Sequence, residues 1–377
     1  MPYSHPRPHV APAQARPAIC VLVLLAAALS ACTSSSSAGS PQSALQASGL
    51  SAGAVRLTGA GSTFDAPFFT LAFPAYQQSH PGVSVSYASV GSSAGITRFS
   101  GGQVNFGATD VPAAPADLAS ASGTTEQIPV DLGAVTVAYN VLTRNGAALR
   151  LTGPVLAKIF LGQIVKWDDP ASTALNPGAD LPDAWITVVH RTDGSGTTYI
   201  FSNYLSEVSP AWAAKVGTGR SLSWPAGYGA NGNPGVAAAF ARIPYSIGYV
   251  ERSYTTGTAL GVAAIQNKAG DYVTPTQGAI AADAAGKPVI TPDDFSIVNE
   301  PGSGACPICG YSWVLVSAHQ QSKPAGQALV SLLSWLIHDG QSYAATLGYV
   351  PLPPAIQQLA SATLARVTGP AGTLLGS

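Results

Sequence analysis

The chain has 377 residues, a formal net charge of −1 at pH 7 and only 9% charged residues. Nucleic-acid binding normally needs a basic surface, and because the sequence contains no cluster of Lys and Arg, this class of function is excluded. Once a leader and a tether are set aside, roughly 320 residues remain, which is enough for two domains.

The N-terminus has the pattern of an export signal. An apolar run at residues 19–29 is shorter than the roughly 20 residues that a permanent membrane-spanning helix needs. It leads into Leu-Ser-Ala-Cys at residues 29–32, which resembles the bacterial lipobox. This resemblance implies that residues 1–32 are a lipoprotein signal peptide and that acyl chains such as palmitate anchor Cys32 to the cell membrane. A secretory signal cut after Ala31 is the alternative.

Residues 33–54 are rich in Ser, Ala and Gly and carry almost no charge. A segment of this composition cannot bury a core, so it is predicted to be a flexible tether. No other long apolar run follows it. We therefore expect a soluble, extracytoplasmic protein that only its lipid holds at the membrane, on the periplasmic side or the outer face.

Beyond the tether, short β-rich runs alternate with helical ones, which is typical of an α/β fold with largely parallel sheets. The predicted strands are residues 83–90, 135–142, 185–190, 247–250 and 311–316. The predicted helices are residues 67–79, 153–161, 197–207, 325–338 and 355–366. Leucines recur at helical spacing in the fourth helix, which indicates a core-facing stripe. The Gly- and Pro-rich stretches are predicted to be ordered surface loops, and they are residues 165–182 and 217–235.

Four short segments combine glycine with hydroxyl or charged side chains. They are residues 59–64, 90–95, 106–110 and 191–198. Three of them lie between a predicted strand and a predicted helix, where the free N–H groups of a helix N-terminus suit an oxyanion. Glycine lets the backbone approach a ligand closely, and hydroxyls add further hydrogen-bond donors. Together the segments predict an anion-binding site.

The mature chain would keep two cysteines, Cys306 and Cys309, in the sequence Cys-Pro-Ile-Cys. A structural zinc site would need more ligands than this pair, so no metal site is expected. In a cytosolic, thioredoxin-like context such a pair would be redox-active. Outside the membrane, we expect a local disulfide that tightens a loop.

In chain order, the four segments resemble the periplasmic phosphate-binding proteins of bacterial ABC importers. The likeness extends to four other runs and covers roughly residues 55–360; these runs are residues 161–169, 175–178, 216–219 and 247–251. The resemblance implies an α/β, two-lobed periplasmic-binding-protein fold of type II, the Venus-flytrap arrangement, with the ligand in the cleft between the lobes. Lobe I would combine residues 55–132 and 252–377, and lobe II would be residues 133–251.

The resemblance also implies a role for each site residue. The expected phosphate ligands are Thr63, Phe64, Ser92, Asp110, Arg191, Ser195, Gly196 and Thr197. Arg191 would be the only positive charge on the ligand, and a salt bridge to Asp193 would orient it. Asp110 would accept a hydrogen bond from protonated phosphate, whereas sulfate has no proton to give at neutral pH and would be rejected.

The chain departs from the family pattern at two positions. Asp65 stands where Pro is common, and we expect it to cap the helix that begins near Pro67, with its carboxylate turned outward. The alternative is a carboxylate turned inward, which would repel the ligand and weaken its binding. Ala94 stands where Gly is frequent, so the loop before it approaches the ligand less closely. Ser62 is expected only to form a turn.

Two enzyme classes are alternatives to a binding function. Residues 91–95 fit the GxSxG nucleophile elbow, but a hydrolase also needs a positioned base, and His190 at a strand end is expected to be packed. A metal-dependent phosphatase needs clustered His and carboxylate ligands, which the sequence lacks at the usual spacings. We therefore expect no catalysis, no metal and no cofactor.

The prediction is high-affinity capture of inorganic phosphate by a monomer that delivers it to ABC permease subunits and their ATPase. Binding of another oxyanion, such as sulfate or molybdate, is the alternative within the same fold. A sensor or surface adhesin built on that fold is a third class of function.

Overall fold

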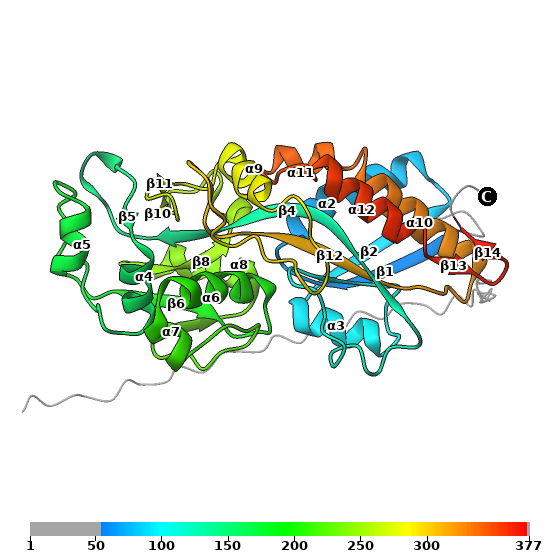
Figure 1. Cartoon of the computed structure of the whole chain (residues 1–377), viewed down its shortest axis with the longest axis horizontal. Helices are drawn as coiled ribbons and strands as arrows, with labels where there is room; N and C mark the ends of the chain where they lie inside the picture. Colours follow the sequence, from blue (N-terminus) through cyan, green and yellow to red (C-terminus); the bar gives the residue numbers. More distant parts are fainter. Residues whose placement is uncertain (1–53, 375–377) are drawn as a thin grey trace, which may run out of the picture.

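The computed structural model describes residues 54–374 and contains two α/β lobes that lie end to end (Figure 1). The expected signal peptide, Cys32 and nearly all of the tether lie outside the described residues. One curled sheet runs through both lobes in the strand order β2-β1-β3-β12-β4-β8-β6-β7. None of the helices in the described part combines the length and apolar character needed to cross a bilayer.

The first lobe holds the parallel strands of the sheet's first half together with β12, which runs antiparallel to β3 and β4. Its strands are β1 (Val55–Gly61), β2 (Val83–Ser89), β3 (Phe106–Thr109), β12 (Cys309–Ser317) and the first part of β4 (Thr125–Tyr139). Its helices are α2 (Ala66–Ser79), α3 (Ser92–Ser100), α10 (Lys323–Ile337), α11 (Gln341–Thr346) and α12 (Pro354–Leu364). A small hairpin, β13 (Thr368–Gly369) and β14 (Gly372–Thr373), follows. In Figure 1, α3 lies on the opposite side of the sheet from α10 and α12.

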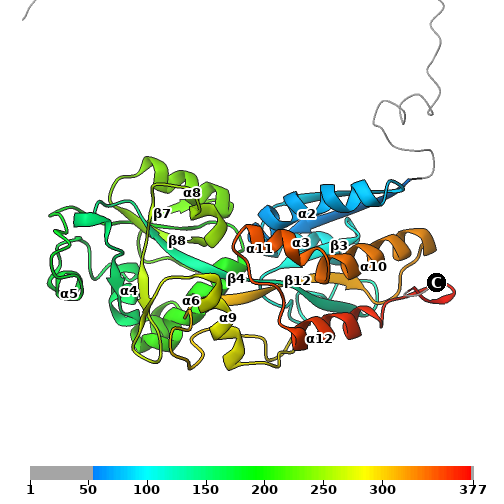
Figure 2. The ribbon, with the colours of Figure 1, turned by 90° about the horizontal axis from the view of Figure 1, so that it is seen from above.

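The second lobe is built on the other end of the same sheet, where β6 runs parallel to both β7 and β8. Its strands are β5 (Arg150–Leu151), β6 (Thr187–Arg191), β7 (Tyr228–Ala230) and β8 (Ser246–Glu251). Its helices are α4 (Gly153–Phe160), α5 (Pro170–Leu175), α6 (Gly196–Val208), α7 (Pro210–Lys215) and α8 (Gly232–Arg242), with short 3-10 turns η1 (Arg144–Gly146) and η2 (Arg252–Thr255). Figure 2 shows α6 and α8 on opposite faces of this lobe.

Strand β4 joins the lobes because one part of it pairs with β12 and the next part pairs with β8. Its register with β12 shifts beside Asp131, which faces Ser312, whereas Pro129 faces Trp313. The residue between them is an extra one, as in a β-bulge, and a bulge bends a strand and re-aims its side chains. The crossover therefore turns next to a buried carboxyl group.

The chain after residue 252 stays with the second lobe for longer than expected. β9 (Gly261–Val262) pairs with β4 at Ala138 and Tyr139, and β10 (Ala264–Gln266) pairs with β5 and with β11 (Tyr272–Val273). The chain then passes through α9 (Gln277–Gly286) and returns to the first lobe at β12. The boundary expected at residue 252 therefore does not describe this segment.

The predicted strands and helices are present, mostly within three residues of their expected ends. The exception is β4, which begins at Thr125 because its first part pairs with β12. The two stretches predicted as loops contain α5, β7 and the start of α8. α5 forms because Asp169 accepts a hydrogen bond from the Ala171 N–H at 2.9 Å, and a proline occupies its first turn. The leucine stripe of α10 is buried as predicted.

The disulfide expected from the sequence is absent: Cys306 and Cys309 are separate, buried thiols. They lie near Asp283, in the core between α9 and the start of β12. Burial raises the pKa of the Cys309 thiol well above its usual range. Since the thiolate is the reactive form, this environment disfavours disulfide formation.

Thiol titration tests this arrangement. In a chain carrying Cys20→Ser and Cys32→Ser and purified without reductant, we expect a thiol reagent to modify no cysteine in native buffer and two after unfolding in guanidinium. Burial explains the first result, and the absence of an S–S bond explains the second. Finding no free thiol after unfolding would restore the disulfide.

Candidate functional site

The four Gly-rich segments meet where the two lobes touch. Residues 59–64 cover the end of β1 and the loop after it, residues 90–95 lead into α3, residues 106–110 cover β3 and the residue after it, and residues 191–198 connect β6 to α6. Direct hydrogen bonds cross between the lobes here, from the Ser93 N–H to the Gly194 carbonyl oxygen at 3.0 Å and from the Gly196 N–H to Ser92 Oγ at 3.1 Å. The predicted anion site is thus assembled from both lobes.

Two glycines allow this close approach. Gly91 has a φ of +91°, and a Cβ there would lie 2.3 Å from an Asp193 carboxylate oxygen in the other lobe. At Gly196, a Cβ would lie 2.5 Å from the Cβ of Asp110. Any larger residue at either position would hold the lobes apart.

Asp110 lies at the centre of the site and is only 2% exposed. Its Oδ1 accepts hydrogen bonds from the hydroxyls of Ser62 and, at 3.3 Å, Ser312, and its Oδ2 accepts one from Thr197 Oγ1 at 3.3 Å. Burial raises the pKa of Asp110 to about 6, although the Ser62 hydrogen bond and the Arg191 charge oppose the shift. The carboxyl group is therefore a buried acceptor that titrates close to neutral pH.

Arg191 is the guanidinium of the site and is 3% exposed. It forms a bidentate salt bridge with Asp193, in which Nε donates to Oδ1 at 2.7 Å and Nη2 contacts Oδ2. The expected salt bridge is thus present. Burial alone would raise the pKa of Asp193, but the hydrogen bond and charge of Arg191 hold that pKa below its usual value.

Thr197 connects the carboxylate and the guanidinium. Its Oγ1 accepts from Arg191 Nη1 at 3.4 Å and donates to Asp110 Oδ2 at 3.3 Å. Ser195 caps α6 by accepting the Thr198 N–H at 3.1 Å, so the positive end of this helix points into the site. Asp110 and Arg191, which come from different lobes, consequently share one cluster.

Thr63 and Phe64 approach from the first lobe. Thr63 Oγ1 accepts hydrogen bonds from both the backbone N–H and the side-chain amide of Asn233, each at 3.0 Å. The Phe64 N–H donates to Ser62 Oγ at 2.8 Å, and its carbonyl oxygen accepts from the Tyr349 hydroxyl at 2.6 Å. These bonds fix the loop after β1 against both lobes.

Three residues of the cluster were missed by sequence reasoning: Ser62, Asn233 and Ser312. Asn233 is fully buried, and its amide also donates to Thr197 Oγ1 at 3.2 Å, so it bridges the lobes. Its Gly-Asn-Pro-Gly context was interpreted as a loop, although Gly followed by a polar residue before a helix is the same signal that identified the other segments. Nothing in the local pattern around Ser312 distinguishes it from other strand residues.

Asp65 does not cap α2, so that expectation was wrong. Its side chain is 0% exposed, accepts no hydrogen bond at the helix N-terminus, and points into the core instead of outward. Burial raises the pKa of this carboxyl well above its usual range, and the nearby Asp131 and Asp110 raise it further. A carboxylic acid, not a carboxylate, therefore fits this position.

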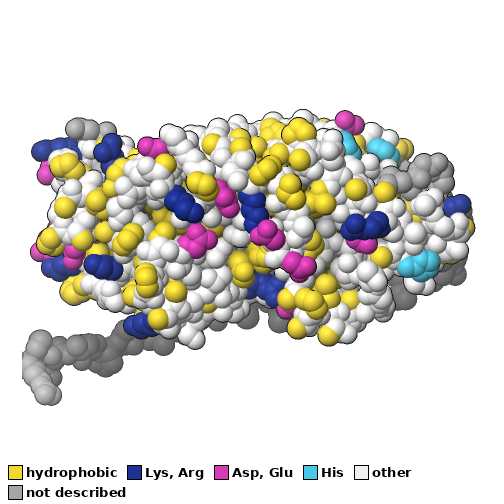
Figure 3. Space-filling model, in the orientation of Figure 1, with side chains coloured by type: hydrophobic (Ala, Val, Ile, Leu, Met, Phe, Trp, Pro, Cys, Tyr) yellow, Lys and Arg dark blue, Asp and Glu magenta, His cyan; other side chains and the backbone are white. Residues whose placement is uncertain are grey.

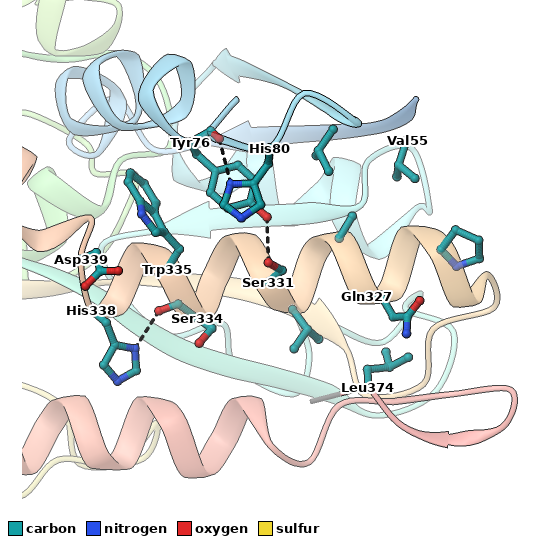
Figure 4. A pocket seen from close by; sticks show the side chains of 14 residues that line it. Val55, Tyr76, His80, Gln327, Ser331, Ser334, Trp335, His338, Asp339 and Leu374 are labelled. Atoms are coloured by element: carbon teal, nitrogen blue, oxygen red, sulfur yellow. Dashed lines mark hydrogen bonds between the residues drawn. The ribbon is translucent and has the colours of Figure 1, made fainter. Parts of the chain in front are cut away.

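A groove of about 810 Å³ lies elsewhere, between α2 and α10 (Figure 4). Tyr76, His80, Trp335 and His338 contribute aromatic side chains to it, and no Lys or Arg lines it. Without a cation and without convergent N–H donors, it does not suit an oxyanion. The junction between the lobes is the better candidate.

A metal centre or a basic surface patch would be a rival site. Within residues 54–374, no group of His, Cys, Asp or Glu side chains is arranged to hold a metal ion. On the face shown in Figure 3, basic side chains are scattered among acidic ones and form no continuous basic patch.

The buried ion pair of the site can be tested by unfolding. Asp193→Asn would leave the Arg191 guanidinium buried without its counter-charge, and we expect it to lower the free energy of unfolding by about 3–5 kcal/mol. Asp183→Asn is the matched control, because it breaks an exposed pair with Lys166 and should cost no more than about 1 kcal/mol. If denaturant unfolding shows that both variants lose the same free energy of unfolding, burial is not what makes the Arg191–Asp193 pair important.

Known proteins resemble this chain in both sequence and fold. Residues 33–338 match the family model described as the PBP superfamily domain. The chain is 40% identical over 302 residues to the phosphate-binding protein PstS of Xylella fastidiosa, an alignment that covers 80% of this chain and 82% of that protein. It is 36% identical over 307 residues to the phosphate-binding protein PstS of Methanocaldococcus jannaschii, covering 75% of this chain and 79% of that protein.

Solved structures agree on the architecture. A high-affinity periplasmic phosphate-binding protein (PfluDING) bound with phosphate superposes with a TM-score of 0.64 at 19% identity, covering 82% of this chain and 93% of that one. A phosphate-binding protein from Stenotrophomonas maltophilia gives a TM-score of 0.63 at 18% identity, covering 82% and 94%. The two-lobed periplasmic-binding-protein fold is thereby confirmed. With the sequence relatives, it shows that the chain belongs to the PstS family of phosphate-binding proteins, within the PBP superfamily.

Proposed function

We propose that the chain binds inorganic phosphate outside the cytoplasm and delivers it to the permease subunits of an ABC transporter, which import it with their ATPase. The observation that carries this proposal is that the buried side chains of Asp110 and Arg191 both form hydrogen bonds with the Thr197 hydroxyl. Relatives named as phosphate-binding proteins support the same ligand.

The charges of the cluster favour an anion that still carries a proton. Phosphate at neutral pH can donate that proton to Asp110 while its other oxygens accept from Arg191 and from neutral donors. Sulfate cannot donate, so it would face an unpaired, repulsive carboxylate in a dehydrated site. This difference favours phosphate over sulfate or molybdate, which remain the alternative ligands.

The neutral donors are backbone N–H groups and hydroxyls. We assign this role to Thr63, Phe64, Ser92, Ser195, Gly196 and Thr197. Several of them already take part in bonds across the lobes: Gly196 with Ser92, Thr63 with Asn233, and Thr197 with Asp110. An anion at this position would exchange those bonds for stronger, charge-assisted ones.

Closure of the lobes would enclose the ligand. Besides the site itself, Arg220 of the second lobe forms a salt bridge at 2.6 Å with Asp117 of the first, and both side chains are partly exposed. Hinge closure of this kind takes place where a strand crosses between lobes, which here is β4 as it passes from its pairing with β12 to its pairing with β8. The closed form would then be the one that docks on the permease.

Several finer points belong to the same proposal. We infer that the chain is a monomer without a cofactor, is anchored through acylated Cys32, and catalyses no reaction. The serine of the GxSxG pattern, Ser93, has no histidine among its hydrogen-bond partners in the described chain. His190 instead stacks on Trp224 with ring centroids 4.9 Å apart, which supports a packing role.

Calorimetry with phosphate and sulfate tests the role of Asp110. We expect tight phosphate binding and no measurable sulfate binding to the unchanged chain. Asp110→Asn removes the repulsive carboxylate, so the ratio of phosphate to sulfate affinity should fall by at least about 100-fold. Asp180→Asn, which changes an exposed carboxylate far from the cluster, serves as the control. Comparable sulfate affinity in the unchanged chain would rule out this account of selectivity.

The bridge made by Asn233 gives a second prediction. Asn233→Ala removes hydrogen bonds that join Thr63 of one lobe to Thr197 of the other, so we expect phosphate affinity to fall about 10-fold or more. Most of the loss should be in the dissociation rate, because the closed form is the one destabilised. Gln103→Ala, at an exposed position, is the control. An unchanged dissociation rate in stopped-flow measurements would argue against the bridge.

A further inference from the structure

A second group of carboxyl groups lies behind Asp110. Asp65, Asp131 and Glu251 are each at most 1% exposed, and they belong to the start of α2, to β4 and to the end of β8. We propose that Asp65 and Asp131 are positioning residues for the ligand acceptor Asp110: as a neutral carboxylic acid pair, they hold the Ser312 hydroxyl so that it donates to Asp110. This inference rests on the proposed function.

The strand register places Asp131 beside Ser312. These two residues face each other across the β4–β12 ladder, next to the bulge, so their side chains lie on the same face of the sheet. The Ser312 hydroxyl in turn donates to Asp110 Oδ1 at 3.3 Å. A line of contacts therefore runs from Asp131 through Ser312 to the proposed ligand site.

The loop after β1 brings Asp65 close to Asp131. The ring of its neighbour Phe64 packs on β4 at Gly133, where a Cβ would lie only 2.6 Å from the ring. Gly133 is two residues from Asp131 along the strand, and alternate residues of a strand share a face. The loop after β1 consequently lays Asp65 over the crossover next to Asp131.

The hydrogen-bond inventory argues that this pair is not ionised. None of the four oxygens of Asp65 and Asp131 accepts a well-formed hydrogen bond from a described residue. The two carboxyl groups nevertheless lie within interaction range of each other and of the Ser312 hydroxyl. A buried carboxylate without a donor or a counter-charge is very unfavourable, and such a group takes up a proton instead. A protonated carboxyl can donate, and Ser312 has lone pairs to accept with, because its single hydrogen is directed at Asp110.

The charged groups around Asp65 and Asp131 also favour the protonated form of the pair. The carboxyl groups near the pair are those of Asp110 and Glu251, and three tyrosine hydroxyls also lie near it, those of Tyr87, Tyr254 and Tyr349. Two cations lie in this region: Arg191 is paired with Asp193, and Arg252 interacts with Glu251. Burial first, and then these negative neighbours, raise the pKa of Asp65 and of Asp131 well above the usual range, although the Ser312 hydroxyl opposes the shift at both carboxyls. Burial also raises the pKa of Glu251, to about 8. A neutral pair keeps further negative charge away from an incoming anion.

Infrared spectroscopy tests the neutral pair directly, and it does not require phosphate binding. The difference spectrum at pH 7 between the full-length chain in detergent and its D65N/D131N variant should contain the carbonyl band of a protonated carboxylic acid. Asp283→Asn is the control for this band, since Asp283 is a remote buried acid whose pKa burial raises to about 10. Carboxylate bands in place of the acid band would overturn the proposal.

Phosphate affinity separates a positioning role from a merely structural one. D65N/D131N keeps side chains that can donate but cannot ionise, so its dissociation constant at pH 7 should stay within about 3-fold of the unchanged chain. Asp131→Leu removes the donor behind Ser312, and we expect affinity to fall about 10-fold. A gain of 10-fold or more in D65N/D131N would mean that the pair is ionised, and unchanged affinity in Asp131→Leu would mean that it does not position Asp110. Failure of the unchanged chain to bind phosphate would instead refute the proposed function. The infrared result would still show whether the pair is protonated, because that measurement does not depend on phosphate binding.

Thermal unfolding provides a third readout with a definite sign. An acid whose pKa is raised by folding binds its proton more tightly in the native state, so stability is present below the unfolded-state pKa and falls as pH rises towards the native one. D65N/D131N does not lose stability in this way. The melting temperature of the variant minus that of the unchanged chain should therefore be at least about 2 °C larger at pH 8 than at pH 5. A difference that does not depend on pH would contradict the neutral pair.

Discussion

The structure depends on one constraint: a carboxylate and a guanidinium from different lobes are buried together at the junction. Asp110 and Arg191 are almost fully buried and are joined through Thr197. Burying either charge alone would be very unfavourable, so each needs several polar partners. Asp193 supplies them for the guanidinium, and three hydroxyls supply them for the carboxylate. The glycines of the surrounding segments let those partners come close enough.

The fold supplies these partners because every site segment lies at the end of an element of one continuous sheet or at the start of a helix. The segments after β1, β3 and β6 end at the same boundary, and α3 and α6 begin there. Strand β4 crosses that boundary without a break, and its bulge places Asp131 directly behind the site. A movement of the lobes at this crossover would therefore reach both the ligand groups and the buried acids.

Much of this arrangement could be predicted from sequence because local patterns determine it. Alternating strands and helices and glycine before a helix each carry their own signal, and the resemblance to phosphate-binding proteins implied the salt bridge of Arg191 and Asp193, which is present. Asn233 and Ser312 were missed because their roles arise from long-range contacts: Asn233 bonds to Thr63, and Ser312 faces Asp131 only through strand register.

The wrong expectations have the same origin. An Asp before a helix usually caps it, but at Asp65 burial against β4 outweighs the capping preference. A CxxC outside the membrane predicts a disulfide, yet the two cysteines are placed as core thiols. The resemblance to the family implied that the chain after residue 252 belongs to the first lobe, whereas pairing with β4 and β5 keeps its first part with the second lobe. In each case tertiary packing, which no short window contains, determines the result.

A crystal structure of the chain grown with phosphate tests the central claim most directly. We predict one phosphate at the junction, with one oxygen within hydrogen-bond distance of an Asp110 carboxylate oxygen and others within reach of the Arg191 guanidinium and the start of α6. A phosphate that occupies the groove between α2 and α10, or one that contacts Arg191 but not Asp110, would contradict the account.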